Sequence, residues 1–442
     1  MSTSCSALSR RGFLQTSLAL AQHKRKPNIV LFIYDDLGYG DLGCYGQQHI
    51  LTPHSDRVAR EGTRCTGVYA GGSVCGPSRS CLMTGLHTGH TPIRTNAGTV
   101  PLRDEDVTLP ELLKQAGYAT GGFGKWGLGD ARTPGTPTRQ GFDEFVGYYH
   151  QMHAHSYYPE YLWDGDRRLD LPKGTYSADV IAERAFQFLR RKREKPYFLY
   201  CPFTLPHAKF EGPDPKPYGD RPWPDGHKMY ASMVTRADAY LGEILKLIDD
   251  NTLLLVTSDN GAHYGEEKGF EFFRSNGALR GQKGELYEGG LRVPMIARWP
   301  GRIAAGRVDK HPWAFWDLLP TLTEAAGART PSGLDGRSMW PLLTGHKPPG
   351  ARPLYWENCA YSRKENRLLP MPVAQAMRIG EWKAIQPKPN APIEVYHLAK
   401  DPSETNDVAA AQPALVDQAI SLFGSARTTP RAHDDGTFEW AK

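Results

Sequence analysis

The sequence has no apolar run that approaches the roughly 20 residues of a membrane-spanning helix, so no membrane span is expected. It has no internal repeat and no low-complexity segment, which argues against a solenoid or a linker protein. The net charge is only +5, from 53 Lys and Arg against 48 Asp and Glu, and the charges are spread along the chain. This balance suits an anionic substrate but does not indicate nucleic acid as a partner.

Cysteine is scarce and scattered, so no disulfide framework can be predicted. The seven cysteines include no CxxC pair and no zinc-ligand spacing. The 35 Pro and 46 Gly indicate many loops, as in a large enzyme with a loop-built site. At 442 residues with 40% hydrophobic composition, the chain has room for a large core and one or two globular domains.

The first 22 residues have the features of an export signal. Arg10 and Arg11 lie in Ser-Arg-Arg-Gly-Phe-Leu, which resembles a twin-arginine signal, and a short apolar run follows. The run ends in Ala19-Leu20-Ala21, a small-x-small cleavage pattern. A disordered basic N-terminus is the alternative. The pattern favours export to the bacterial periplasm or beyond, so the protein is expected to be periplasmic or secreted.

Two adjacent carboxylates follow the first predicted strand. The run from Pro27 to Tyr34 is continuously apolar, as expected for a strand covered on both faces, and it ends in Asp35 and Asp36. Paired carboxylates at a buried strand end are costly without a cation, and hard oxygen ligands favour Ca²⁺ or Mg²⁺ over zinc. The alternative is a solvated turn.

The stretch from Val74 to Gly85, VCGPSRSCLMTG, has the features of a nucleophile at a helix start. Pro77 fits the first turn of a helix, which places Cys75 at or just before the N-terminus. There the dipole and free N–H groups favour anions, and Arg79 adds a fixed positive charge. A small buried cysteine before an ordinary helix is the alternative reading of Cys75 alone.

The pattern C-x-P-S-R followed by S-x-x-x-T-G resembles the signature of the type I sulfatases. The resemblance implies that Cys75 is oxidised after translation to formylglycine (3-oxoalanine), whose hydrate is the nucleophile, by a formylglycine-generating enzyme or an anaerobic maturase. The run through Asp35 and Asp36 resembles the first metal-binding strand of the family, and Thr257-Ser-Asp-Asn-Gly261 resembles the second. The implied Ca²⁺, with Mg²⁺ as the weaker alternative, has as its ligands Asp35, Asp36, Cys75, Asp259 and Asn260.

Three further motifs resemble the remaining parts of a sulfatase site. Lys125, in Gly-Lys-Trp-Gly-Leu-Gly, matches the lysine that contacts sulfate, and His207, after Pro206, matches the general acid for the leaving oxygen. Lys283 matches the lysine between sulfate and leaving oxygen, within a run from Arg280 to Pro294 that resembles R-G-x-K-x-x-x-Y-E-G-G-x-R-V-P. Gly127 departs from the family, because many members have a histidine there near the nucleophile.

Candidate substrate-binding residues are His153, His155 and Arg280. The two histidines project the same way if their segment is extended, and aromatic residues follow them. The stretch looks like the substrate-side loop of carbohydrate-active sulfatases. A solvated loop with packing aromatics is the alternative, and Arg280 could be purely structural. Possible rim groups in the C-terminal part are Asn358, Arg363 and Lys364.

Alternating buried strands and helices predict an α/β sandwich with a mostly parallel central sheet. The resemblance makes this an alkaline phosphatase-like fold with a smaller C-terminal α+β subdomain that contains a short antiparallel sheet. The expected divisions are an export signal at 1–22, a catalytic domain at 23–348 and a C-terminal subdomain at 349–442.

The predicted reaction is hydrolysis of a sulfate ester, with a sulfated carbohydrate as the expected substrate and removal from a chain end as the expected mode. In family terms Cys75, Arg79, Lys125, His207 and Lys283 are the catalytic residues. Two alternatives stay open: a phosphodiesterase or phosphonate hydrolase of the same superfamily, and a non-catalytic protein that binds sulfated glycan.

Overall fold

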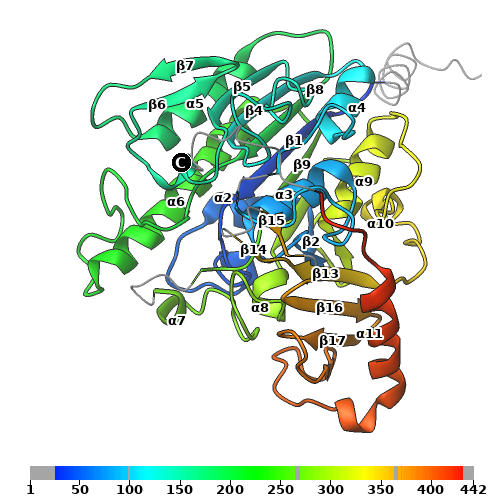
Figure 1. The fold of residues 1–442 in the computed structure, drawn as a ribbon. Coiled ribbons are helices and arrows are strands. Elements are labelled where there is room, and N and C mark those ends of the chain that lie inside the picture. The colour runs from blue at the N-terminus through cyan, green and yellow to red at the C-terminus, as the bar shows by residue number, and fades with distance from the viewer. Residues whose placement is uncertain (1–24, 98–99, 264–268, 363–366, 370, 432–442) are drawn as a thin grey trace, which may run out of the picture.

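The computed structural model describes residues 25–97, 100–263, 269–362, 367–369 and 371–431 (Figure 1). The expected export signal and the rim candidates Arg363 and Lys364 lie outside these residues. Within the described chain, no helix combines the length and the apolar character needed to cross a membrane. The described cysteines are all free thiols.

A ten-stranded sheet forms the centre of the molecule, and its central run β9-β1-β8-β4-β5 is parallel throughout. This confirms the predicted mostly parallel sheet. Antiparallel pairings occur only toward its two edges. In their order across the sheet, the strands are β11 (Arg307–Asp309), β2 (Thr63–Cys65), β10 (Met295–Arg298), β9 (Thr252–Ser258), β1 (Asn28–Tyr34), β8 (Tyr197–Pro202), β4 (Ala119–Lys125), β5 (Glu144–Tyr148), β6 (Tyr161–Asp164) and β7 (Arg167–Asp170).

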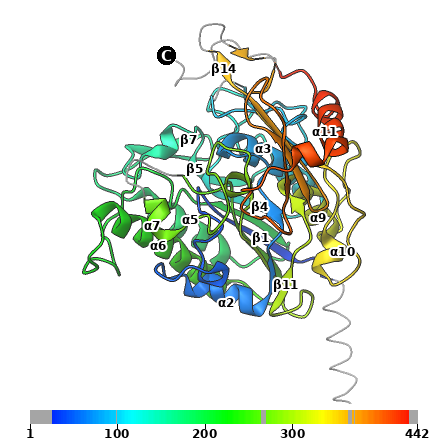
Figure 2. The ribbon, with the colours of Figure 1, turned by 90° about the horizontal axis from the view of Figure 1, so that it is seen from below.

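The apolar run of β1 follows from the burial of this strand on both faces of the sheet. Its alternate side chains enter two different cores, with Val30, Phe32 and Tyr34 on one face and the intervening isoleucines and leucine on the other. Seen from below, β1 and β4 lie between helices on both sides (Figure 2). The sheet is therefore the middle layer of a three-layer sandwich.

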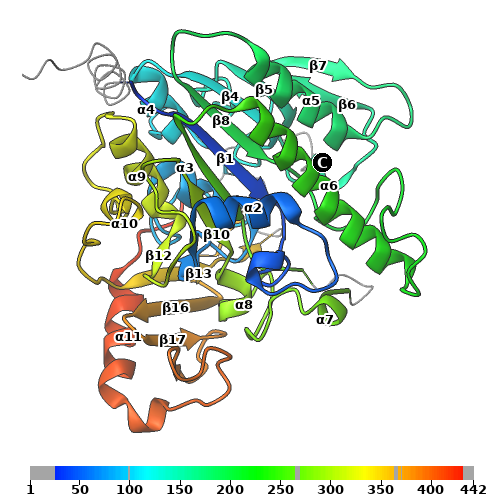
Figure 3. The same cartoon turned by 180° about the vertical axis from the view of Figure 1, so that it is seen from behind.

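Each face of the sheet has its own set of helices. One face packs against α2 (Pro53–Glu61), α5 (Ser177–Arg190) and α6 (Asp225–Leu247), which are in front when the molecule is seen from behind (Figure 3). The other face packs against α3 (Cys75–Thr84), α4 (Leu109–Gln115), α9 (Leu318–Ala325) and α10 (Trp340–Leu343). Thr108 and Glu111 form a capping box that starts α4.

The C-terminal part adds a four-stranded antiparallel sheet, which confirms the prediction of a short one there. It has the order β13 (Leu354–Asn358), β16 (Ala374–Ile379), β17 (Trp382–Gln386) and β18 (Glu394–His397), and α11 (Pro413–Ser425) covers one face. Its other face shares an apolar cluster with Tyr69 and Trp316 of the larger part. The two parts thus share one core, and the division at residue 348 stays a prediction.

The remaining elements are short. The run 65–70 is divided between the end of β2 and β3 (Val68–Tyr69), and β3 pairs with β12 and not with a strand of the large sheet. The segment 153–155, whose two histidines would align if it were extended, is a 3₁₀ turn, η2 (His153–His155). The others are η1 (Gly43–Tyr45), α7 (Gly269–Phe273), α8 (Glu288–Leu291), β12 (Trp313–Ala314), η3 (Phe315–Asp317), β14 (Tyr361–Ser362), β15 (Arg367–Leu368) and η4 (Ala409–Ala411).

Candidate active site

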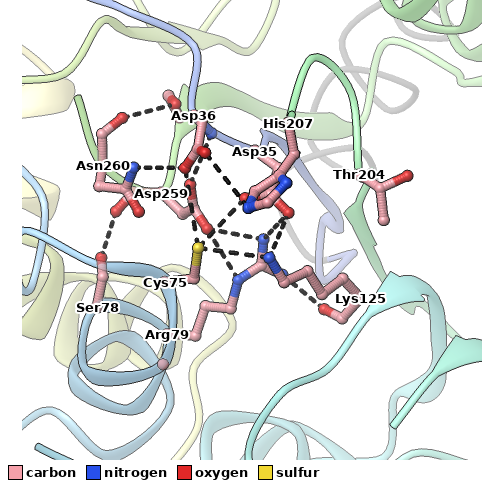
Figure 4. A network of polar contacts seen from close by, with 12 residues as sticks. Asp35, Asp36, Cys75, Ser78, Arg79, Lys125, Thr204, His207, Asp259 and Asn260 are labelled. Carbon is pink, nitrogen blue, oxygen red and sulfur yellow. Dashed lines mark hydrogen bonds and ion pairs between the residues drawn. The ribbon is translucent and has the colours of Figure 1, made fainter. Parts of the chain in front are cut away.

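Four neighbouring parallel strands bring the predicted site residues to one edge of the sheet. The carboxyl ends of β9, β1, β8 and β4 lie next to one another, which is where open α/β sheets place their sites. The residues that these ends and the following loops supply are Asp259 and Asn260 after β9, Asp35 and Asp36 after β1, His207 after β8, and Lys125 at the end of β4 (Figure 4).

Cys75 is the first residue of α3 and lies fully inside this group. Its thiol contacts Asp35 Oδ1 at 3.4 Å and Asp36 Oδ1 at 3.9 Å, and Lys125 Nζ donates to its Sγ at 3.4 Å. Burial, then Asp259 and Asp35, raise the pKa of the thiol. Burial beside these carboxylates therefore disfavours the thiolate of an unmodified Cys75, which is the reactive form.

Arg79, one turn into α3, ties the helix to the strand ends. Its Nε and Nη2 donate to one oxygen of Asp259 at 3.0 and 2.8 Å, and Nη1 donates to the carbonyl of Lys125 at 2.6 Å. The guanidinium is completely buried, so these bonds fix its orientation. Ser78 also links the helix to β9, through its hydroxyl and the Asp259 carbonyl at 2.5 Å.

Two lysines place positive charge on either side of the carboxylate pair. Lys125 Nζ lies 2.7 Å from Asp35 Oδ2, and Lys283 Nζ lies 2.7 Å from Asp36 Oδ2. Burial opposes ionisation of both carboxyls, but Lys125 holds the pKa of Asp35, and Lys283 that of Asp36, below the ordinary value. Both lysines stay charged, because the nearby carboxylates outweigh burial and raise their pKa.

His207 completes the group from the β8 side. Its Nδ1 faces the carbonyl of Ala208, to which it donates, so the neutral ring has its lone pair on Nε2. Lys283 Nζ lies 3.1 Å from that Nε2, and Asp36 Oδ2 lies 3.4 Å from it. Burial lowers the pKa of His207 to about 3, and Asp36 only partly offsets this. The imidazole is thus aimed at the same space as Lys283 and Cys75.

Comparison with known proteins agrees with this geometry. The sulfatase family model matches residues 27–328, and a model of the C-terminal part of N-sulphoglucosamine sulphohydrolase matches residues 282–420. The chain belongs to the sulfatase family. Its fold is the alkaline phosphatase-like sandwich that the sequence predicts.

Relatives within the sulfatase family come from animals and bacteria. The mouse (Mus musculus) steryl-sulfatase is 31% identical over 414 residues, an alignment that covers 73% of this chain and 65% of the mouse protein. An N-acetylgalactosamine-6-O-sulfatase of Bacteroides thetaiotaomicron is 28% identical, with 92% of this chain and 94% of that protein covered. The crystal structure of Ps i-CgsB in complex with k-i-k-neocarrahexaose matches with a TM-score of 0.81 and 28% identity, over 93% of this chain and 96% of that one.

The carboxylate cluster fits the divalent cation that sulfatases use. Oxygen and sulfur atoms of Asp35, Asp36 and Cys75 lie within 4.8 Å of one another, together with a nitrogen of His207. Asp36 has φ +65°, a strained backbone for a residue other than glycine, and its N–H donates to Asp259 Oδ1 at 3.1 Å. Asn260 Nδ2 donates to Asp36 Oδ1 at 2.7 Å, and the buried Oδ1 of the same amide has no hydrogen-bond partner among the described residues, so this oxygen is available to a hard cation.

The three candidate substrate-binding residues lie in different places. Because η2 is a 3₁₀ turn and not an extended segment, the condition for a common direction is not met, and the two histidines lie in different surroundings. His153 packs between the rings of Tyr148 and Tyr161, whereas His155 stacks on His207 with ring centroids 4.5 Å apart. Of the pair, only His155 contacts the catalytic group.

Arg280 lies over the Tyr287 ring and binds the C-terminal part of the chain. Its guanidinium donates to Tyr396 Oη at 3.0 Å and to the Glu404 carbonyl at 2.9 Å. These contacts give Arg280 a structural role in joining the loop before α8 to the C-terminal sheet. Asn358, a rim candidate, bonds Ser73 and the Gly284 carbonyl, each at 2.8 Å, close to both Cys75 and Lys283 in sequence.

Sequence reasoning missed two amide side chains next to Cys75. Asn96 Oδ1 accepts the N–H of Gly76 at 2.7 Å, and the carboxamide of Gln151 lies against Gly127. Neither residue is part of a motif with fixed spacing from Cys75. Only the glycine at 127 gave a signal, because it left space that another side chain had to fill.

Proposed function

We propose that the protein hydrolyses sulfate esters of carbohydrates, with residue 75 as the site of covalent chemistry. The observation that carries the proposal is the buried group in which Cys75, at the N-terminus of α3, lies between Asp35 and Lys125. The carbohydrate assignment is supported by the Bacteroides relative, an N-acetylgalactosamine-6-O-sulfatase, and by Ps i-CgsB, whose structure contains neocarrahexaose. We also propose that residues 1–22 direct export and that 349–442 form a C-terminal subdomain.

The residues around position 75 have different proposed roles in sulfate transfer. Lys125 and Lys283 lie on two sides of the group and bind the sulfuryl oxygens, whose charge they neutralise in a buried site. Arg79 orients Asp259 and the α3 N-terminus. His207 is the proposed general acid: the negative charge of a bound sulfate ester favours the imidazolium, which takes a proton from solvent at Nε2 and gives it to the leaving oxygen.

Two groups beyond the encoded side chains take part in this proposal. Formylglycine, which a maturation enzyme would make from Cys75, would add water, and one hydroxyl of the resulting hydrate would be the nucleophile. Asp35, Asp36 and Asp259, with the Asn260 amide oxygen, would hold a cation, proposed as Ca²⁺, which would supply positive charge to the site.

Sulfate release from a panel of sulfated oligosaccharides tests the function, with matched phosphate and phosphonate esters measured alongside. We expect release from at least one sulfated sugar and loss of that release in Cys75→Ala. Cys81→Ala is the matched control, because Cys81 is also buried in α3 but donates to the Gly71 carbonyl, away from the strand ends. Faster turnover of the phosphate esters favours the phosphodiesterase alternative. Binding of sulfated glycan without turnover favours the non-catalytic one.

A further inference from the structure

The side chain of Gln151 lies directly against Gly127. A Cβ added at Gly127 would lie 2.1 Å from Gln151 Nε2 and 2.8 Å from its Cδ. The carboxamide of Gln151 therefore occupies the space that a side chain at position 127 would fill. Gly127 follows Lys125 by two residues, and its N–H is fixed by the Tyr149 carbonyl at 2.9 Å.

The carboxamide of Gln151 has no hydrogen-bond partner among the described residues. The residue is 3% exposed, and both Oε1 and Nε2 are buried and unpaired. Burial of an amide without partners costs stability, and native proteins retain few such groups. An unsatisfied amide next to a catalytic group is therefore expected to have a ligand.

The same carboxamide lies beside the first turn of α3. A Cβ at Gly76, the residue after Cys75, would be 3.6 Å from Gln151 Nε2 and 2.8 Å from Asn96 Oδ1. Gln151 also lines a small cavity together with Asn96 and Gly127. On the strand side, Lys125 extends from β4 to within 3.4 Å of the Cys75 sulfur. The amide is thus next to the backbone that carries the nucleophile position.

We infer that Gln151 is a substrate-contacting residue, whose amide N–H groups donate hydrogen bonds to an oxygen of the sulfate ester bound beside residue 75. The inference rests on the proposed function and assigns to Gln151 the place left by glycine at 127. A carboxamide neither gains nor loses a proton near neutral pH. Gln151 therefore binds and orients the sulfate and does not act as a base.

Gln151→Met tests the assignment, since methionine keeps the length of the side chain and removes both polar atoms. We expect kcat for sulfate release to fall about 100-fold or more, as for loss of a donor to a developing charge. We expect the thermal midpoint to stay the same or rise, because an unpaired buried amide is removed. A structural role predicts the opposite pattern, with a lower midpoint and unchanged kcat.

Gln375→Met is the matched control, because Gln375 is also buried but its Nε2 donates to Tyr355 Oη at 2.7 Å and to the Phe423 carbonyl at 3.0 Å. This variant should lose thermal stability and keep its kcat and KM for sulfate release. It calibrates the stability change that a satisfied buried glutamine produces.

Two variants at positions 127 and 151 test whether side chains at these positions compete for the same space. Gly127→His places a side chain on the Gln151 amide, whereas Gly127→His with Gln151→Ala removes the clash. Both variants have the same backbone strain at φ +78°, so the difference in thermal midpoint between them reports the clash. We expect the double variant to be the more stable.

The outcomes separate this inference from the proposed function. If the wild type releases no sulfate from any ester, the proposed function fails, and the thermal comparison alone still decides whether Gln151 is structural. A Gln151→Met protein with a lower midpoint overturns the assignment in either case. So does a Gln151→Met protein with wild-type kcat in an active enzyme.

Discussion

A buried lysine joins the C-terminal sheet to the catalytic part, and its loss has a large predicted effect on stability. Lys383 Nζ, on β17, lies 3.1 Å from Glu288 Oε1 and 2.9 Å from Glu404 Oε1, and all three side chains are inaccessible to solvent. Glu404 also accepts the N–H of Glu288 at 2.6 Å. Lys383→Met leaves Glu288 and Glu404 buried together without the lysine that they share, while Arg292 Nη1 stays 3.5 Å from Glu288 Oε2.

We expect Lys383→Met to lower the free energy of unfolding by about 3–5 kcal/mol at pH 8, the usual cost of an uncompensated buried charge. The loss should be smaller at pH 5. Burial raises the pKa of Glu404 to about 7, although Lys383 opposes the shift, so removing the lysine raises it further. A carboxyl whose folded pKa is raised stabilises the fold at low pH and loses that contribution as pH rises through the folded value.

Urea unfolding of the wild type and the variant at pH 5 and pH 8 measures this effect. Lys383→Met with Glu404→Gln should recover part of the loss, because one buried charge is removed and the amide oxygen can still accept from the Glu288 N–H. The matched control is Lys246→Met, whose exposed lysine pairs with Glu243 at 2.6 Å and should contribute less than about 1 kcal/mol. A loss under about 1 kcal/mol for Lys383→Met, equal at both pH values, would refute the reasoning.

Two further predictions concern acid stability and metal removal. Burial lowers the pKa of His87 to about 4, so its contribution to stability is present above the unfolded pKa near 6.5 and is lost as pH falls toward 4. His87→Phe should flatten the decline of unfolding free energy between pH 6.5 and 4, measured by urea unfolding against the exposed control His346→Phe; an equally steep decline in His87→Phe contradicts this. Chelation of divalent ions should lower the thermal midpoint, and Ca²⁺ should restore it, because Asp35, Asp36 and Asp259 otherwise repel one another in a buried site. Burial raises the pKa of Asp259 to about 6, and repulsion by the Asp35 carboxylate adds to this shift. An unchanged midpoint in chelator contradicts the cation site.

Much of the fold was predictable because each central strand is covered on both faces. Such strands appear in the sequence as continuous apolar runs, and β1 and β9 end in acidic residues whose burial needs compensation. The resemblance to the two metal-binding strands of the family also predicted that Asp35 and Asp259 would meet, and they do so because neighbouring parallel strands end at the same edge. The Cys75 motif placed the start of α3 correctly.

The remaining contacts depend on tertiary packing that no local pattern contains. Gln151 reaches position 127 only because β5 pairs with β4 and the loops after the two strands lie side by side. The 3₁₀ turn at His153–His155 separates two histidines that an extended segment would align. Lys383 meets Glu288 across 95 residues of sequence.

The most direct test of the account is the mass of the peptide that contains residue 75, taken from protein that releases sulfate. We predict that the mass of this peptide is roughly 18 Da lower than that of the unmodified cysteine peptide. This is the difference expected when the thiol of residue 75 is converted to the aldehyde of formylglycine. An unmodified thiol in a preparation that releases sulfate would contradict the central claim that the chemistry takes place on a modified residue 75.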